Sequence, residues 1–160
     1  MPEVNNLSDI LVSGLINIET TLRIDSFPVP YFPVTYPFFG INSTVSAVGY
    51  NVAKALTVLG NKVNFLSVTG RDLAGEVVRK TLTGDNISGA YVLQSIEKTA
   101  QSVILFDRDG KRQIHVDLKD IQEYIYPEEI FFEAIKDCSL AVLCNINFSR
   151  PFLRKAKEMN

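Results

Sequence analysis

The stretch that decides the fold is Ser46-Ala47-Val48-Gly49-Tyr50-Asn51-Val52-Ala53. A proline-rich segment precedes it, and a helical pattern begins within it. Gly60-Asn61 then supplies the glycine that commonly follows a helix C-terminus. A helix from about 48 to 59 is therefore expected. Its apolar side chains recur at helical spacing, at Val48, Val52, Leu56 and Leu59.

Downstream of this helix, strand and helix patterns alternate. Asp72 is a suitable N-cap for a second helix, and prolines open two more. The apolar face expected for the second helix is Leu73, Val77, Val78 and Leu82. Buried strands are expected at Ile10–Val12, Val63–Val68, Tyr91–Leu93 and Leu140–Cys144, and helix starts at Pro127 and Pro151. Such alternation is typical of a parallel α/β sheet.

Two β-rich segments interrupt this alternation, at about 21–47 and 100–116. The first holds four of the seven prolines and many aromatic residues without a helical period. The second is a hairpin pattern around Asp107-Arg108-Asp109-Gly110, a turn-forming stretch that ends in glycine. We expect them to form a small sheet that stands off the main one.

Composition limits the classes of function. The 160 residues are 46% hydrophobic and 21% charged, which is ordinary globular usage, and the net charge is −2. No basic stripe offers a nucleic-acid surface, and no apolar run approaches the roughly 20 residues that span a bilayer. The first ten residues, MPEVNNLSDI, do not resemble a secretory leader, so a cytoplasmic location is expected. Cys138 and Cys144 are expected to be free thiols.

The helix and its flanks resemble the first signature of the PfkB, or ribokinase, family of carbohydrate kinases. The matching positions are Gly49, Asn51, Ala53, Gly60 and Gly70. The resemblance covers nearly the whole chain in the family's order. It implies a ribokinase-like three-layer α/β/α sandwich with a small β lid, of which residues 1–160 are the N-terminal, substrate-binding half.

The resemblance also suggests which residues bind substrate. Gly49 leaves the start of the helix open to a hydroxylated ligand, and the Asn51 amide can donate and accept hydrogen bonds. After the first strand, the family pattern Gly-x-x-Asn-x-Asp corresponds to Gly14, Asn17 and Glu19. Glu19 keeps the carboxylate but places it one methylene further out, so the choice of hydroxyl or the pocket shape differs.

Other positions depart from the family pattern. Ser46-Ala47 stands where the family commonly has Gly-Gly, and Val48 where some members have lysine. Asn147 stands where many members have a glutamate of the magnesium and phosphate network. An asparagine cannot supply that negative charge.

The resemblance implies transfer of the ATP γ-phosphate to a hydroxyl of a sugar or nucleoside. The catalytic base and anion hole of the family lie in an Asp-Thr-x-Gly-Ala-Gly-Asp motif, which this chain lacks. We therefore expect no catalytic residue and no metal site here, with ATP and Mg²⁺ bound mainly by the C-terminal half. The isolated chain should be inactive.

Alternatives to a kinase stay open. A noncatalytic ribokinase-like module, binding a ligand for regulation, is compatible with the departures at 19, 46–48 and 147. A nicotinamide dinucleotide domain is poorly supported, because Gly14 does not begin a G-x-G-x-x-G turn. The lone histidine, His115, favours a structural or exposed role. The aromatic residues of the first insertion favour a small-sheet core or a dimer face, as in the family's lids: Phe32, Tyr36, Phe38 and Phe39.

Overall fold

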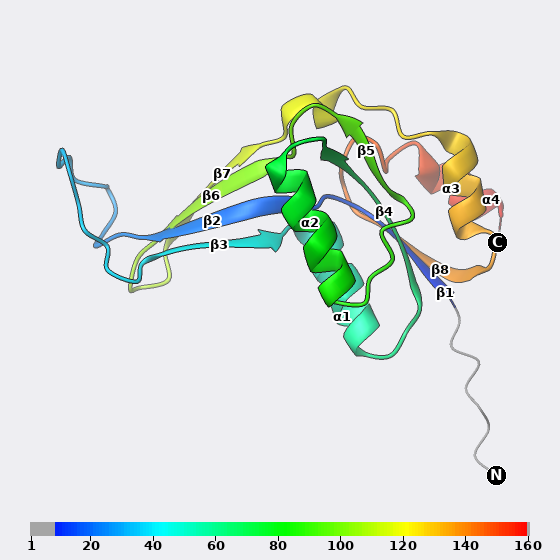
Figure 1. The fold of residues 1–160 in the computed structure, drawn as a ribbon, viewed down its shortest axis with the longest axis horizontal. Coiled ribbons are helices and arrows are strands. Elements are labelled where there is room, and N and C mark those ends of the chain that lie inside the picture. The colour runs from blue at the N-terminus through cyan, green and yellow to red at the C-terminus, as the bar shows by residue number, and fades with distance from the viewer. Residues whose placement is uncertain (1–8, 160) are drawn as a thin grey trace, which may run out of the picture.

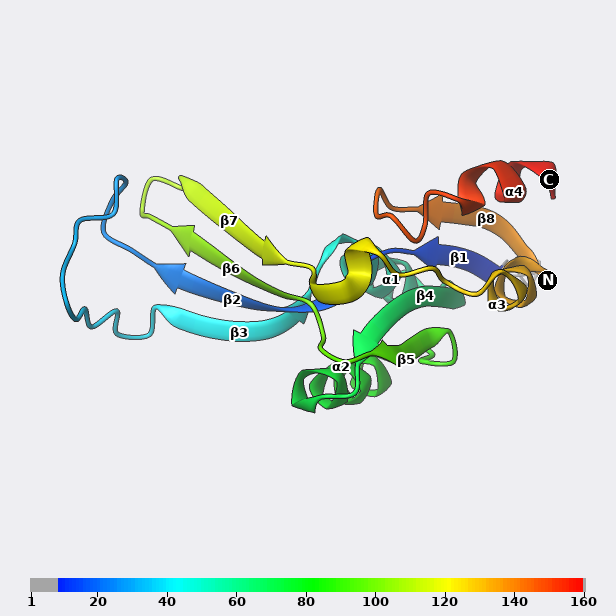
Figure 2. The ribbon, with the colours of Figure 1, turned by 90° about the horizontal axis from the view of Figure 1, so that it is seen from above.

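The computed structural model describes residues 9–159, which form two four-stranded sheets lying end to end (Figures 1 and 2). Most of the N-terminal stretch that was judged not to be a leader, residues 1–8, lies outside the described part. None of the helices in the described part is long and apolar enough to cross a membrane.

The main sheet is wholly parallel, as the alternating pattern predicted. Its spatial order is β5-β4-β1-β8. The strands are β1 (Asp9–Ser13), β4 (Val63–Gly70), β5 (Val92–Ile96) and β8 (Cys138–Leu143). Leu11 and Val12 point to opposite faces of the central strand β1, yet both are fully buried. Both faces of the sheet are therefore covered, which explains the continuous apolar runs.

Helices cover the two faces in pairs and produce three layers. Ile10 and Val12 pack in one core with the first pair of helices, and Leu11 packs in a second core with the other pair. The first pair is α1 (Val48–Val58) and α2 (Leu73–Gly84); the second is α3 (Glu128–Ile135) and α4 (Phe152–Glu158), preceded by the short 3₁₀ helix η1 (Lys119–Gln122). The expected α/β/α sandwich is confirmed.

The buried faces of α1 and α2 are only in part those expected: Val78 and Leu82 are buried as predicted, and Val52 and Leu56 pack against the core. In α1, Gly49, Tyr50 and Ala53 are buried, whereas Val48 and Leu59, the residue after the helix, are exposed. In α2 the buried residues are Gly75, Val78 and Leu82, whereas Leu73 and Val77 are exposed. The apolar pattern was misleading because small residues, which carry little hydrophobic signal, let both helices approach the sheet closely.

The small sheet extends away from the three layers (Figure 1). Its order is β3-β2-β6-β7, with β2 and β6 parallel and the outer pairs antiparallel. The strands are β2 (Asn17–Arg23), β3 (Ile41–Ser46), β6 (Gln101–Phe106) and β7 (Arg112–Asp117). β2 begins at Asn17, four residues before the expected insertion. In the turn between β6 and β7, the Asp107 carboxylate accepts hydrogen bonds from the backbone amides of Asp109 and Lys111.

The aromatic residues of the loop between β2 and β3 do not build a core for this sheet. The loop lies at the far end of the small sheet in Figure 1. Phe38 is 75% exposed and Phe39 is wholly exposed. The expectation of a small-sheet core is therefore wrong for these residues, because the loop extends past the sheet instead of folding over it.

Candidate functional site

A cavity of about 370 Å³ lies between the carboxyl edge of the main sheet and the small sheet. The loops after β1 and β8, the start of α1 and one face of the small sheet line it. Ligands of open parallel sheets bind outside the carboxyl ends of the strands. The topology therefore places the cavity where a substrate is expected.

Asn17 is the most deeply buried polar residue of this cavity. It is 3% exposed, and its Nδ2 donates a hydrogen bond to Ser102 Oγ at 3.1 Å. Its Oδ1 is buried without a hydrogen-bond partner among the described residues. A buried polar atom without a partner costs free energy, so this oxygen is a natural acceptor for a ligand donor.

Glu19 lies on the same face of β2 as Asn17, two residues further along the strand, and also lines the cavity. Its register partners are Thr44 on β3 and Ser102 on β6. Side chains two apart on a strand point to one face, so Asn17 and Glu19 present an amide and a carboxylate side by side.

Gly49 packs against the loop that follows β1. A Cβ added to Gly49 would lie 2.5 Å from the carbonyl carbon of Gly14 and 2.8 Å from the nitrogen of Leu15. The backbone amide of Tyr50 donates to the Leu15 carbonyl oxygen at 3.2 Å. The missing side chain thus lets α1 start directly against this loop, and binding of substrate by Gly49 stays a prediction.

Asn51 is exposed and does not line the cavity, but it is linked to the residues that do. Its Nδ2 donates to Ser46 Oγ at 3.5 Å, and Ser46 lies opposite Asn17 in the register of β2 and β3. The structure therefore brings three of the four expected residues, Asn17, Glu19 and Asn51, to one end of the small sheet.

Ala47 lines the cavity in an unusual backbone conformation. Its φ is 93° and its ψ is 160°, a region that is essentially restricted to glycine. The family pattern commonly has glycine here, and Ala47 adopts a backbone conformation that is typical of glycine.

The loop after β8 contributes Cys144, Asn145 and Ile146 to the cavity, but not Asn147. The Asn147 Nδ2 instead donates to the backbone carbonyls of Gln122 and Tyr124, at 2.7 and 3.2 Å. Burial raises the pKa of the Cys144 thiol, so this cysteine is a neutral thiol at pH 7. The side chain at 147 therefore joins two loops, and Asn145 is the polar group of this loop that faces the cavity.

Several lining residues were missed by sequence reasoning. Two are polar, Ser102 and Asn145, and three are apolar, Ile104, Ile114 and Val116. Ser102 and Ile104 are two residues apart on one hairpin strand, and Ile114 and Val116 are two apart on the other. This alternation could have shown that the side chains of each pair point to the same face. The sequence does not show which face turns toward the main sheet.

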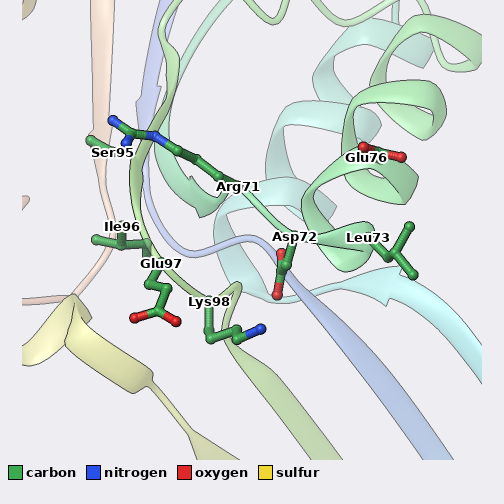
Figure 3. Close-up of a pocket in the computed structure, with 8 residues that line it drawn as sticks. All are labelled: Arg71, Asp72, Leu73, Glu76, Ser95, Ile96, Glu97 and Lys98. Atoms are coloured by element: carbon green, nitrogen blue, oxygen red, sulfur yellow. The ribbon is translucent and has the colours of Figure 1, made fainter.

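A second, more open cavity of about 630 Å³ lies beside the start of α2 (Figure 3). Its charged side chains carry both signs, and Asp72 is already engaged in the fold. The Asp72 carboxylate accepts hydrogen bonds from the backbone amides of Gly75 and Thr99 and from Thr99 Oγ1. Arg71 Nε donates to the Gln94 carbonyl oxygen. These contacts join the turn after β4 to the strand that enters the small sheet, so we assign this region a structural role.

Comparisons with known proteins identify the family and the fold of the chain. The model of the pfkB family carbohydrate kinases matches residues 10–151. The pseudouridine kinase of Escherichia coli (strain K12) is 31% identical over 114 residues, which cover 63% of this chain and 36% of that protein.

Solved structures share the fold. A microbiome-derived acarbose kinase has a TM-score of 0.80 at 24% identity, with 96% of this chain and 51% of that chain covered. Arabidopsis thaliana ribokinase, complexed with ribose and ATP, has a TM-score of 0.68 at 18% identity, with 84% and 44% covered. The chain thus spans about half the length of these structures and about a third of the curated relative.

Proposed function

Because this chain belongs to the pfkB family of carbohydrate kinases, we propose that it supplies the acceptor site of an ATP-dependent sugar or nucleoside kinase. The observation that carries the proposal is the buried Asn17, whose Oδ1 has no hydrogen-bond partner among residues 9–159 and which shares a face of β2 with Glu19. A hydroxyl of the substrate can donate to both side chains.

In this proposal Asn17 and Glu19 hold the hydroxyls of the substrate directly. Gly49 keeps α1 close to the loop after β1, so that the helix start borders the site. Asn51 donates a hydrogen bond to Ser46 at the side of the cavity. The small sheet acts as a lid that keeps water from the transferred phosphoryl group, since water would otherwise compete as acceptor.

The residues present do not form a site for ATP and Mg²⁺. Within residues 9–159 no three His, Cys, Asp or Glu side chains are grouped to hold a metal, and the sequence has no Gly-Ala-Gly-Asp motif. Asn147 is neutral and its amide nitrogen is bound to two backbone carbonyls. The roles proposed for this chain therefore concern the acceptor substrate alone. ATP is the phosphoryl donor in the proposal, and the ribokinase structure with ribose and ATP supports that choice.

The proposal is tested by measuring ATP consumption of the full-length protein against a panel of sugars and nucleosides. Asn17→Ala should lower kcat/KM by roughly tenfold to hundredfold, because one or two hydrogen bonds to substrate are lost. The matched control is Thr20→Ala, on the opposite face of β2, whose hydroxyl bonds only Ser43 at an exposed position. This variant should keep full activity.

Absence of turnover on every compound, with a folded sample, would contradict the kinase. A noncatalytic ligand-binding module would then be the better interpretation. Equal losses in Asn17→Ala and Thr20→Ala would contradict the acceptor site at Asn17.

A further inference from the structure

The lining of the acceptor cavity changes from polar to apolar along the small sheet. Its polar end adjoins the main sheet, where Asn17 begins β2 and Glu19 lies opposite Ser102. One register step further out, Ile104 lies opposite Ile114 on β7. The face of the small sheet that lines the cavity is therefore divided into two regions of different chemistry, whereas the loop after β1 and the start of α1 add the apolar residues Leu15 and Val48.

The apolar region is exposed to water in the described chain. Ile114 is 50% exposed and Val116 is 53% exposed, although both line the cavity together with Ile104. All three side chains are β-branched and project from neighbouring strands, so they form a rather flat patch. Covering such a patch with an apolar or aromatic ring is favourable, because the exposed apolar area is removed from water.

The charge of the lining restricts the ligand further. Among its described residues the only ionisable side chains are Glu19 and the Cys144 thiol, and none is lysine or arginine. A phosphorylated or carboxylated substrate would meet a carboxylate and no cation. Repulsion between like charges at short range opposes binding of an anionic group beside Glu19, which favours an uncharged ligand at this part of the site.

We propose that the acceptor is an uncharged nucleoside, with its sugar ring at Asn17 and Glu19 and its base on Ile104, Ile114 and Val116. This inference rests on the proposed kinase function and names the substrate class of the same site. A free sugar carries hydroxyls around its whole ring and would leave the apolar patch uncovered. A nucleoside joins a hydroxylated ring to a flat ring with apolar faces, which matches the order of the two regions.

The experiment compares kcat/KM of the full-length protein for uridine, adenosine and inosine with kcat/KM for ribose and ribose 5-phosphate. We expect at least one nucleoside to exceed free ribose by roughly tenfold or more, since burial of an apolar ring contributes differences of this size. Ribose 5-phosphate should be the poorest substrate.

Ile114→Ser should lower kcat/KM for the preferred nucleoside roughly tenfold and leave that for ribose unchanged. The matched control is Val103→Ser on the opposite face of β6, where the valine is 41% exposed. It should change neither value. Val116→Ser is a second test variant, and thermal melting confirms that each variant folds.

Two results would overturn the inference while leaving the kinase intact: ribose preferred over every nucleoside, or equal losses on ribose and nucleoside in Ile114→Ser. If no compound is phosphorylated, the kinase proposal fails. In that case, calorimetric measurement of ligand binding tests the inference independently of the kinase proposal. Uridine, adenosine and inosine binding no more tightly than ribose would overturn it, and tighter nucleoside binding that is weakened by Ile114→Ser would support it.

Discussion

Ala47 is the residue whose local geometry is most costly. A side chain at φ 93° and ψ 160° is strained by about 1–3 kcal/mol, and such strain is found mainly at functional sites. Here the strained residue is the link between β3 and α1, and it lines the acceptor cavity. A strained residue in this position is consistent with the proposed acceptor site.

Ala47→Gly should raise the free energy of unfolding by about 1 kcal/mol. The change relieves the strain, and the greater freedom of glycine in the unfolded chain offsets part of the gain, about 0.4–1 kcal/mol. Urea denaturation measures the difference. The control Ala55→Gly, at an exposed position within α1, should instead lower stability by about 1 kcal/mol. Destabilisation by both variants would show that Ala47 is not strained.

At the scale of elements, the joint between α2 and the small sheet depends on one carboxylate. Asp72 caps α2 through the Gly75 amide and also holds Thr99, two residues before β6. Gly70 is required at the same joint, because a Cβ there would lie 2.4 Å from the Thr99 nitrogen. The glycines and the aspartate of this region therefore orient the small sheet without lining the cavity at Asn17.

Asp72→Ala should lower the free energy of unfolding at pH 7 by about 2 kcal/mol, the sum of a lost cap and lost hydrogen bonds to Thr99. Burial by itself acts to raise the pKa of Asp72, but the hydrogen bonds from Thr99 and Gly75 outweigh it and the pKa is lowered. A lowered pKa in the folded state means that the ionised carboxylate stabilises the fold above about pH 4. This stabilisation is lost as the pH falls through the folded pKa.

The measurement is chemical denaturation of both proteins from pH 7 down to pH 3. The difference in the free energy of unfolding between wild type and Asp72→Ala should become smaller over the acidic part of this range. Asp109→Ala, at the exposed hairpin turn, serves as the control and should differ little from wild type at any pH. If the difference in the free energy of unfolding stays constant with pH, the ionised form of Asp72 does not stabilise the contact between α2 and Thr99.

At the scale of the whole molecule, the small sheet extends from the three-layer body and ends in an exposed aromatic loop (Figures 1 and 2). Val29, Tyr31, Phe32, Val34, Tyr36, Phe38 and Phe39 are each at least half exposed. Exposed apolar surface of this extent is typical of interaction sites. We propose that a second copy of the chain covers it, so that two small sheets associate.

The double variant Phe38→Ser and Phe39→Ser should convert a dimer of the full-length protein into a monomer, because both rings would lose their buried contacts. Sedimentation velocity at micromolar concentration measures the change. Val58→Ser, on the exposed side of α1, is the control and should stay dimeric. A wild-type protein that sediments as a monomer would contradict the proposed association.

Much of the fold could be predicted because it depends on local patterns. The β1, β4 and β8 runs, the Asp72 cap and the Asp107 turn each follow from a few neighbouring residues. The orientation of α1 and α2 could be predicted only in part, since Gly49 and Gly75 give no hydrophobic signal although they lie at close contacts. The apolar residues that line the cavity on β6 and β7 were missed for a related reason: strand alternation defines two faces but not which one meets the body.

Local patterns are enough to predict the parallel sheet, the two β insertions and the family resemblance, and the resemblance implies the candidates Asn17, Glu19, Gly49 and Asn51. The stretch 46–53 indicated where the helix begins, because periodicity and glycine placement are local properties. Three features become visible only in the folded chain. Gly49 allows close contact with Gly14, and Ala47 has a backbone conformation typical of glycine. Asn17 Oδ1 has no hydrogen-bond partner among the described residues. All three depend on how segments far apart in the chain pack together, and this geometry is fixed only when the layers assemble.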